Sequence, residues 1–278
     1  LRQQGDETTD LFKKAYYYII DEPAGSDLER ARVCDLIVSR CKFAVADAYL
    51  KDYPDLYYSL ISLSHLVTTP YADDMVGTDT VGGVQTWCPL FDRFHSEVQR
   101  QQYKDRQENS ERLGGEDVWW YGAYDPEVPF PTYHMDDELT GSRMLSWLQF
   151  DYDIDGNLYW QVNRFMDGMW EEAQVLGGAA GEGNLMYPGS PYGLNGPIAT
   201  LRLESIREGL EDYEYLWMMK QAVLQYNEEH GTNHDPETLM AWTHEGLYKG
   251  MTLTRGEHQQ FYERRGQILQ ALELLLKD

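Results

Sequence analysis

The sequence predicts an α/β protein of the (β/α)8 TIM-barrel type. Short β-rich runs alternate with segments of helical periodicity, which is typical of parallel strands joined by crossover helices. From residue 201 onward the pattern is helical. With 278 residues and 42% hydrophobic side chains, the chain can bury one large core or two modest ones, and barrels of this size commonly form a single domain.

About five strands are expected from runs rich in aromatic and β-branched residues. A closed (β/α)8 barrel has eight strands, so we expect the first strands of the barrel to be missing from this chain. The five expected strands are AYYYII at 15–20, LYYSLISL at 56–63, GVQTWCPLF at 83–91, DVWWYGAY at 117–124 and NLYWQVN at 157–163.

Helical periodicity fills the stretches between these strands at 27–52, 91–113 and 136–153. Two longer amphipathic patterns follow at 201–229 and 258–276. We therefore expect two parts: a partial (β/α) barrel over residues 1–200, and a helical C-terminal region over residues 201–278 that packs on it.

The charge of the chain excludes some classes of partner. Asp and Glu number 47 against 23 Lys and Arg, a formal net charge of -24, which repels phosphate backbones and anionic lipids. No apolar run reaches the length of a bilayer span, and the chain opens LRQQGDETTD, without a signal segment. Nucleic acid and membrane are not expected partners, whereas an open barrel edge would favour self-association.

The most informative short motif is Tyr18-Ile19-Ile20-Asp21-Glu22-Pro23, an apolar strand that ends in two carboxylates and a proline. Barrel enzymes place catalytic groups at the C-terminal ends of their strands. Successive strand residues point to opposite faces, so adjacent carboxylates share a site only where the strand gives way to its loop. The alternative is that Asp21 and Glu22 simply open a loop before the next helix.

Aromatic and polar groups also occur at the ends of the later expected strands, at the same rim. The chain has 21 Tyr and 8 Trp, whose apolar faces and hydrogen-bonding edges suit a sugar-binding cleft, although large aromatics also fill barrel interiors. The candidate substrate-binding residues are His65, Trp87, Tyr121, Tyr124, Tyr159, Trp160, Asn163 and Tyr187.

No metal or other cofactor is expected. Asp151, Asp153 and Asp155 alternate before Gly156, as at the start of a calcium loop, but the twelfth position is Val162 and not Glu. We interpret this stretch as a turn into the fifth strand.

Several motifs together carry a resemblance to a known family. The strand ending in IIDEP, the later WYGAY, DIDGNLYWQVN and above all GEGNLMYPGSPYGLNGPIATLRLESIREGLEDYEYL resemble the catalytic module of glycoside hydrolase family 123. The resemblance covers roughly residues 15–220. It implies an exo-acting β-N-acetylgalactosaminidase that uses the 2-acetamido group of the substrate as nucleophile.

The resemblance also implies roles for individual residues. Glu22 would protonate the glycosidic oxygen and then activate water, and Asp21 would orient the acetamido nitrogen and stabilise the oxazolinium-like intermediate. Tyr121, or in its place Tyr124, would donate a hydrogen bond to the acetamido carbonyl, and Trp160 would floor the pocket. A glycan substrate implies an extracellular or periplasmic location.

Two alternatives remain open at this point. The chain can be a glycan-binding or scaffolding module without turnover, because function resides in the site and not in the fold. It can also act on other glycosides, with Asp125 or Asp92 as the second carboxylate. The sugar, the linkage and the oligomeric state cannot be read from the sequence.

Overall fold

The computed structural model describes residues 14–173, 175–176, 178–252 and 257–276. Its contacts divide the chain into two compact units. The first holds the described residues up to Tyr121 together with Asp155–Leu158, and the second holds Gly122–Ile154 and the described residues from Tyr159 onward. The expected boundary near residue 200 stays a prediction.

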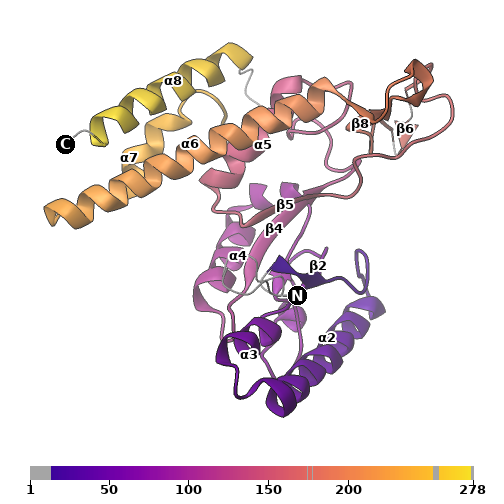
Figure 1. The fold of residues 1–278 in the computed structure, drawn as a ribbon, viewed down its shortest axis with the longest axis vertical. Helices are drawn as coiled ribbons and strands as arrows, with labels where there is room; N and C mark the ends of the chain where they lie inside the picture. The colour runs from indigo at the N-terminus through magenta and orange to yellow at the C-terminus, as the bar shows by residue number, and fades with distance from the viewer. Residues whose placement is uncertain (1–13, 174, 177, 253–256, 277–278) are drawn as a thin grey trace. The chain divides into compact units, whose positions relative to one another are not determined.

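The first unit is built on a five-stranded sheet in the order β1-β2-β3-β4-β5, with helices against it (Figure 1). Its registers are parallel, pairing Tyr17 with His65 and Val67 with Trp87. The expected α/β class is confirmed as a curled, parallel half-barrel. The strands are β1 (Tyr16–Tyr17), β2 (Ser64–Val67), β3 (Thr86–Trp87), β4 (Asp117–Gly122) and β5 (Gly156–Tyr159).

Helices occupy most of the stretches between these strands and most of the described chain from residue 201 onward. The helices are α2 (Ser26–Val45), α3 (Pro54–Ile61), α4 (Glu97–Asn109), α5 (Leu139–Asp151), α6 (Leu201–His230), α7 (Pro236–Met240) and α8 (His258–Leu275). Two antiparallel pairs join β6 (Val175–Leu176) to β7 (Ala179–Ala180) and β8 (Met186–Pro188) to β9 (Pro197–Ala199). In the described part of the chain, no helix is both long and apolar enough to cross a membrane.

The expected second strand at 56–63 is wrong. This segment lies almost wholly in α3, and the strand that pairs with β1 is Ser64–Val67 directly after it. Pro54 occupies the first turn of α3, where its fixed φ suits a helix and its missing N–H costs no hydrogen bond. The aromatic and β-branched residues that suggested a strand are therefore helical.

The sheet of the first unit has two distinct faces because strand side chains alternate. Tyr17 faces α2, where its hydroxyl donates to Asp35, and Trp87 packs near Tyr103 of α4. Tyr18, the next residue after Tyr17, therefore points to the opposite face. Tyr18 is 43% exposed, so this face is open to solvent at the end of β1.

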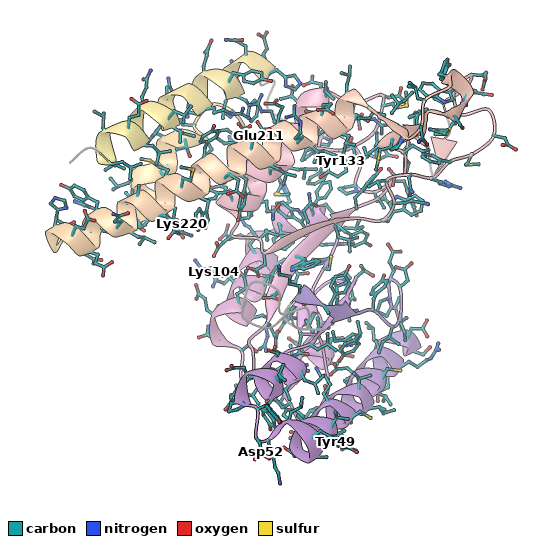
Figure 2. The ribbon with its side chains drawn as sticks, viewed as in Figure 1. Tyr49, Asp52, Lys104, Tyr133, Glu211 and Lys220 are labelled. Carbon is teal, nitrogen blue, oxygen red and sulfur yellow. The ribbon has the colours of Figure 1, made fainter. Side chains whose placement is uncertain are left out.

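The second unit packs α5 and α8 along the long helix α6 (Figure 1). Glu211 and Lys220 mark two points along α6 in Figure 2. The buried carboxylate of Asp212 on α6 accepts hydrogen bonds from Arg143 and Trp147 of α5. A third donor, Arg265, comes from α8, so one carboxylate joins all three helices.

Gly209 sets how closely α5 and α6 approach. A Cβ atom added there would lie 2.5 Å from the backbone oxygen of Arg143. We expect Gly209→Ala to lower the free energy of unfolding by about 1–3 kcal/mol, as overpacking does. Urea denaturation measures this. Gly266→Ala on α8 is the matched control, because its Cβ would meet open space and alanine favours helix; equal effects of the two variants would contradict the prediction.

Candidate active site

The two adjacent carboxylates lie in the loop that follows β1. Glu22 has a φ of 43°, in the left-handed region that side chains other than glycine rarely adopt. Strained backbone of this kind clusters at functional sites, where the surrounding structure holds it in place. This backbone conformation is unfavourable by itself, so contacts with neighbouring residues have to stabilise it.

Each carboxylate accepts a hydrogen bond from a tyrosine. The Tyr18 hydroxyl donates to Asp21 Oδ1, and the Tyr121 hydroxyl, at the end of β4, donates to Glu22 Oε1. Thr68, just after β2, lies between them: its Oγ1 accepts the Glu22 N–H at 2.9 Å and lies 2.8 Å from the Tyr18 hydroxyl. Residues at the ends of β1, β2 and β4 therefore converge on Asp21 and Glu22.

Burial and the carboxylates keep both phenols protonated. Burial, followed by the hydrogen bond to Asp21, raises the pKa of Tyr18 well above its usual value. Burial and the hydrogen bond to Glu22 raise the pKa of Tyr121 in the same way. At neutral pH both hydroxyls are hydrogen-bond donors, while the carboxylates themselves are exposed and open to a ligand.

Of the candidate substrate-binding residues in this unit, the structure brings Tyr121 to the carboxylates but not His65 or Trp87. Both of these are fully buried on the helix-covered face. The His65 ring stacks on Tyr17 at 4.8 Å, and the Trp87 indole donates to Glu116 at 2.8 Å. Strand alternation explains the difference, because His65 and Trp87 share the face of Tyr17 and not that of Tyr18.

His65 belongs instead to a buried polar cluster around Asp35 of α2. Burial would raise the pKa of Asp35, but the His65 ring, the Arg112 guanidinium and the Tyr17 hydroxyl lower it to about 2. Arg112 approaches Asp35 at 3.3 Å, and the backbone N–H of Gly83 donates to it at 2.7 Å. The cluster ties α2 to the loops beneath the sheet.

This cluster predicts a pH dependence of stability. Because the pKa of Asp35 is about 2 when folded against an ordinary 3.8, its contribution is present above pH 3.8 and is lost as pH falls toward 2. We expect Asp35→Asn to lose about 2 kcal/mol at pH 7 and to differ progressively less from wild type between pH 4 and 2. Urea midpoints across that range measure this, with Asp27→Asn as control, because the Asp27 side chain is 44% exposed. A constant difference from wild type would contradict the prediction.

The second unit holds another carboxylate cluster, which the sequence analysis missed. Glu182 is 1% exposed and accepts hydrogen bonds from the Tyr159 hydroxyl at 2.8 Å and from the Trp160 indole. His134 Nε2 lies 3.4 Å from the same carboxylate. Burial would lower the pKa of His134, but Glu182 and the Ala123 carbonyl raise it. The signal that could have revealed Glu182 is an acid between two glycines in the GEGN turn.

The remaining candidates also lie in the second unit. Asn163 forms an antiparallel β-bridge with Asn184, the last residue of the GEGN turn. Tyr124 is 46% exposed. Tyr187 lines a cavity of about 440 Å³ with Trp170, whose ring lies 4.8 Å from its own. Tyr159, Trp160 and Asn163 therefore contact the GEGN turn, and Tyr187 lies at the cavity.

The described residues contain no group of three or more His, Cys, Asp or Glu side chains arranged to hold a metal ion. Asp155 instead ties β4 to the turn before β5, because its Oδ2 accepts the Val118 N–H at 2.8 Å. The Asp-rich stretch thus has a hydrogen-bonding role at the sheet.

Comparison with known proteins identifies the family. No curated protein matches the chain. A solved family 123 glycoside hydrolase from Clostridium perfringens, described for glycolipid glycan hydrolysis, is similar in fold with a TM-score of 0.53 and 14% identity. The similarity covers 82% of this chain and 40% of that one, so this chain spans less than half of that protein. The family described as glycoside hydrolase 123, catalytic domain, matches residues 8–219, and the chain therefore belongs to the glycoside hydrolase 123 catalytic-domain family.

Proposed function

We propose that this protein is a glycoside hydrolase that removes terminal β-linked N-acetylgalactosamine, or a related 2-acetamido sugar, by a substrate-assisted retaining mechanism. The observation that carries the proposal is the Asp21-Glu22 pair. Both carboxylates are exposed after β1, each is hydrogen-bonded by a tyrosine, and Glu22 is held in a left-handed conformation. Family membership makes glycoside hydrolysis the reaction class to test.

Adjacent carboxylates suit a mechanism in which the substrate supplies the nucleophile. Direct displacement by an enzyme carboxylate needs two carboxyl groups about 5 Å apart on opposite sides of the anomeric carbon. Asp21 and Glu22 are adjacent in the loop after β1, so both carboxylates are expected to lie on the same side of the bound sugar. Glu22 then serves as general acid and, after the aglycone leaves, as the base that activates water. Asp21 accepts the acetamido N–H and stabilises the positive charge of the cyclised intermediate.

Tyr121, beside Glu22, can supply the hydrogen-bond donor that this mechanism needs at the acetamido carbonyl. The acetamido oxygen attacks the anomeric carbon, and a donor that holds the carbonyl in line accelerates the attack. In our proposal the protonated Tyr121 hydroxyl leaves Glu22 for that carbonyl when substrate binds, with Tyr124 as the alternative donor. Tyr159, Trp160, Asn163 and Tyr187 stay predicted sugar contacts. His65 and Trp87 are fully buried on the helix-covered face of the sheet and are not part of this proposal.

Three wider expectations belong to the same proposal. The half-barrel sheet would be part of a (β/α)8 barrel, and its open edge would allow self-association. A glycan substrate, such as the glycolipid glycan of the Clostridium perfringens protein, would place the enzyme outside the cytoplasm.

A panel of chromogenic sugars tests the proposal. The full chain is incubated with the 4-nitrophenyl β-glycosides of N-acetylgalactosamine, N-acetylglucosamine and galactose. We expect release from the 2-acetamido sugars and none from galactose, because only the former carry the nucleophile. If the folded protein releases nitrophenol from none of them yet binds the galactosaminide in calorimetry, it is a glycan-binding module and the proposal fails.

A further inference from the structure

The hydroxyl of Thr68 connects the two carboxylates of the active site. Thr68 follows β2 directly and is 6% exposed, so its hydroxyl has little access to water. Its Oγ1 atom lies 2.9 Å from the Glu22 nitrogen, 2.8 Å from the Tyr18 hydroxyl and 3.5 Å from Asp21 Oδ1. All three partners follow β1 and lie 46 to 50 residues earlier in the chain.

The direction of each hydrogen bond follows from chemistry. The Glu22 N–H can only donate, so Thr68 Oγ1 accepts from it. The Tyr18 hydroxyl donates its single proton to Asp21 Oδ1. The Tyr18 oxygen can then only accept from Thr68. Thr68 has one proton, and its 2.8 Å contact with Tyr18 is much shorter than its 3.5 Å contact with Asp21 Oδ1, so the proton goes to Tyr18. The bonds then form one directed chain from the Glu22 N–H through Thr68 and Tyr18 to the Asp21 carboxylate.

We propose that Thr68 is a positioning residue, which fixes the backbone of Glu22 and, through Tyr18, the carboxylate of Asp21. The left-handed conformation of Glu22 is unfavourable by itself, and the bond from its N–H to Thr68 is a contact that stabilises it. The same hydroxyl orients Tyr18, which in turn orients Asp21. One side chain outside the β1 loop thus positions both Asp21 and Glu22. Their catalytic roles are those of the proposed function, on which this inference rests.

Two substitutions at Thr68 separate the hydroxyl from its bulk. Thr68→Val keeps the shape but removes both donor and acceptor, so the Glu22 N–H and the Tyr18 oxygen each lose a partner. Thr68→Ser keeps the hydroxyl and restores the chain. Thr69→Val is the matched control, since Thr69 is the next residue, is 3% exposed, and makes no described hydrogen bond to the carboxylates or Tyr18.

Steady-state kinetics of the full chain on the chromogenic galactosaminide gives the first readout. We expect Thr68→Val to lower kcat about 10- to 100-fold, as small misplacements of catalytic groups do, with KM changed less than about threefold. Thr68→Ser and Thr69→Val should stay within about threefold of wild type in both constants. An unchanged kcat in Thr68→Val, or no rescue in Thr68→Ser, would overturn the proposal.

Amide hydrogen exchange at Glu22, followed by NMR, gives a readout that needs no activity. Thr68→Val should speed exchange of the Glu22 N–H about tenfold or more, because that N–H has lost its acceptor, whereas Thr68→Ser should not. Tyr18→Phe serves if the valine variant does not fold: it should lower kcat but leave Glu22 exchange unchanged, because the Glu22–Thr68 bond precedes Tyr18 in the chain. Unaltered exchange in Thr68→Val, or equal acceleration in Tyr18→Phe, would overturn the proposal. An inactive wild type that shows the expected exchange pattern would refute the proposed function alone.

Discussion

Glu22→Gln should lower kcat/KM on the chromogenic galactosaminide by about 10²- to 10⁴-fold, the range that a general acid–base group contributes. Glutamine keeps the size of the side chain and can still accept from Tyr121, but it cannot transfer a proton to the glycosidic oxygen. The loss should therefore fall on kcat more than on KM. Initial rates over a range of substrate concentrations measure it.

The control for this prediction is Glu29→Gln. Glu29 is an exposed glutamate on the first turn of α2 that pairs with Arg32, and its neutralisation should leave kcat/KM within about twofold. Retained activity in Glu22→Gln would show that another group donates the proton. Activity of Asp21→Asn on the β-galactoside, which carries no acetamido group, would favour Asp92 or Asp125 as the second carboxylate.

Asp212→Ala should lower the free energy of unfolding by about 3–5 kcal/mol, the cost of leaving one partner of a buried ion pair alone. Asp212 and Arg143 have fully buried side chains, and their atoms approach to 2.6 Å. Without the carboxylate, the Arg143 guanidinium keeps its charge in the interior of the second unit, and the Trp147 indole loses its acceptor. Urea denaturation, followed by circular dichroism, measures the effect.

Glu204→Ala, on the same helix, provides the comparison. Glu204 pairs with Arg207, but both side chains are about half exposed, so its removal should cost no more than about 1 kcal/mol. Similar urea midpoints for Asp212→Ala and Glu204→Ala would show that the three-helix junction does not depend on the buried charge.

The sequence predicts the long elements well and the short ones poorly, for physical reasons. The helix expected at 201–229 is α6, because thirty residues of one periodicity leave little ambiguity. The strands are two to six residues long, too short for alternation to be read. The residue composition of LYYSLISL favours a strand, but Pro54 starts a helix, and the segment is helical.

The misplaced strand also explains what the sequence could not show about the site. The Asp21-Glu22 motif is local and can be found in one segment, whereas Thr68 reaches it only through the register that pairs Tyr17 with His65. Without β2 at its true position, Thr68 cannot be placed beside the carboxylates. Glu182 was missed for a different reason, since a single acid in a glycine-rich turn becomes notable only when tertiary structure buries it.

The left-handed backbone at Glu22 has a consequence for attempts to make this protein more robust. Strain of this kind costs on the order of 1–3 kcal/mol, and it would be relieved by a glycine at the same position. A screen that selects only for heat resistance should therefore enrich substitutions at position 22 that remove the carboxylate together with the strain. Stability and turnover compete at this residue, so a thermostable variant has to gain its tolerance elsewhere, for instance on the solvent-facing side of α8.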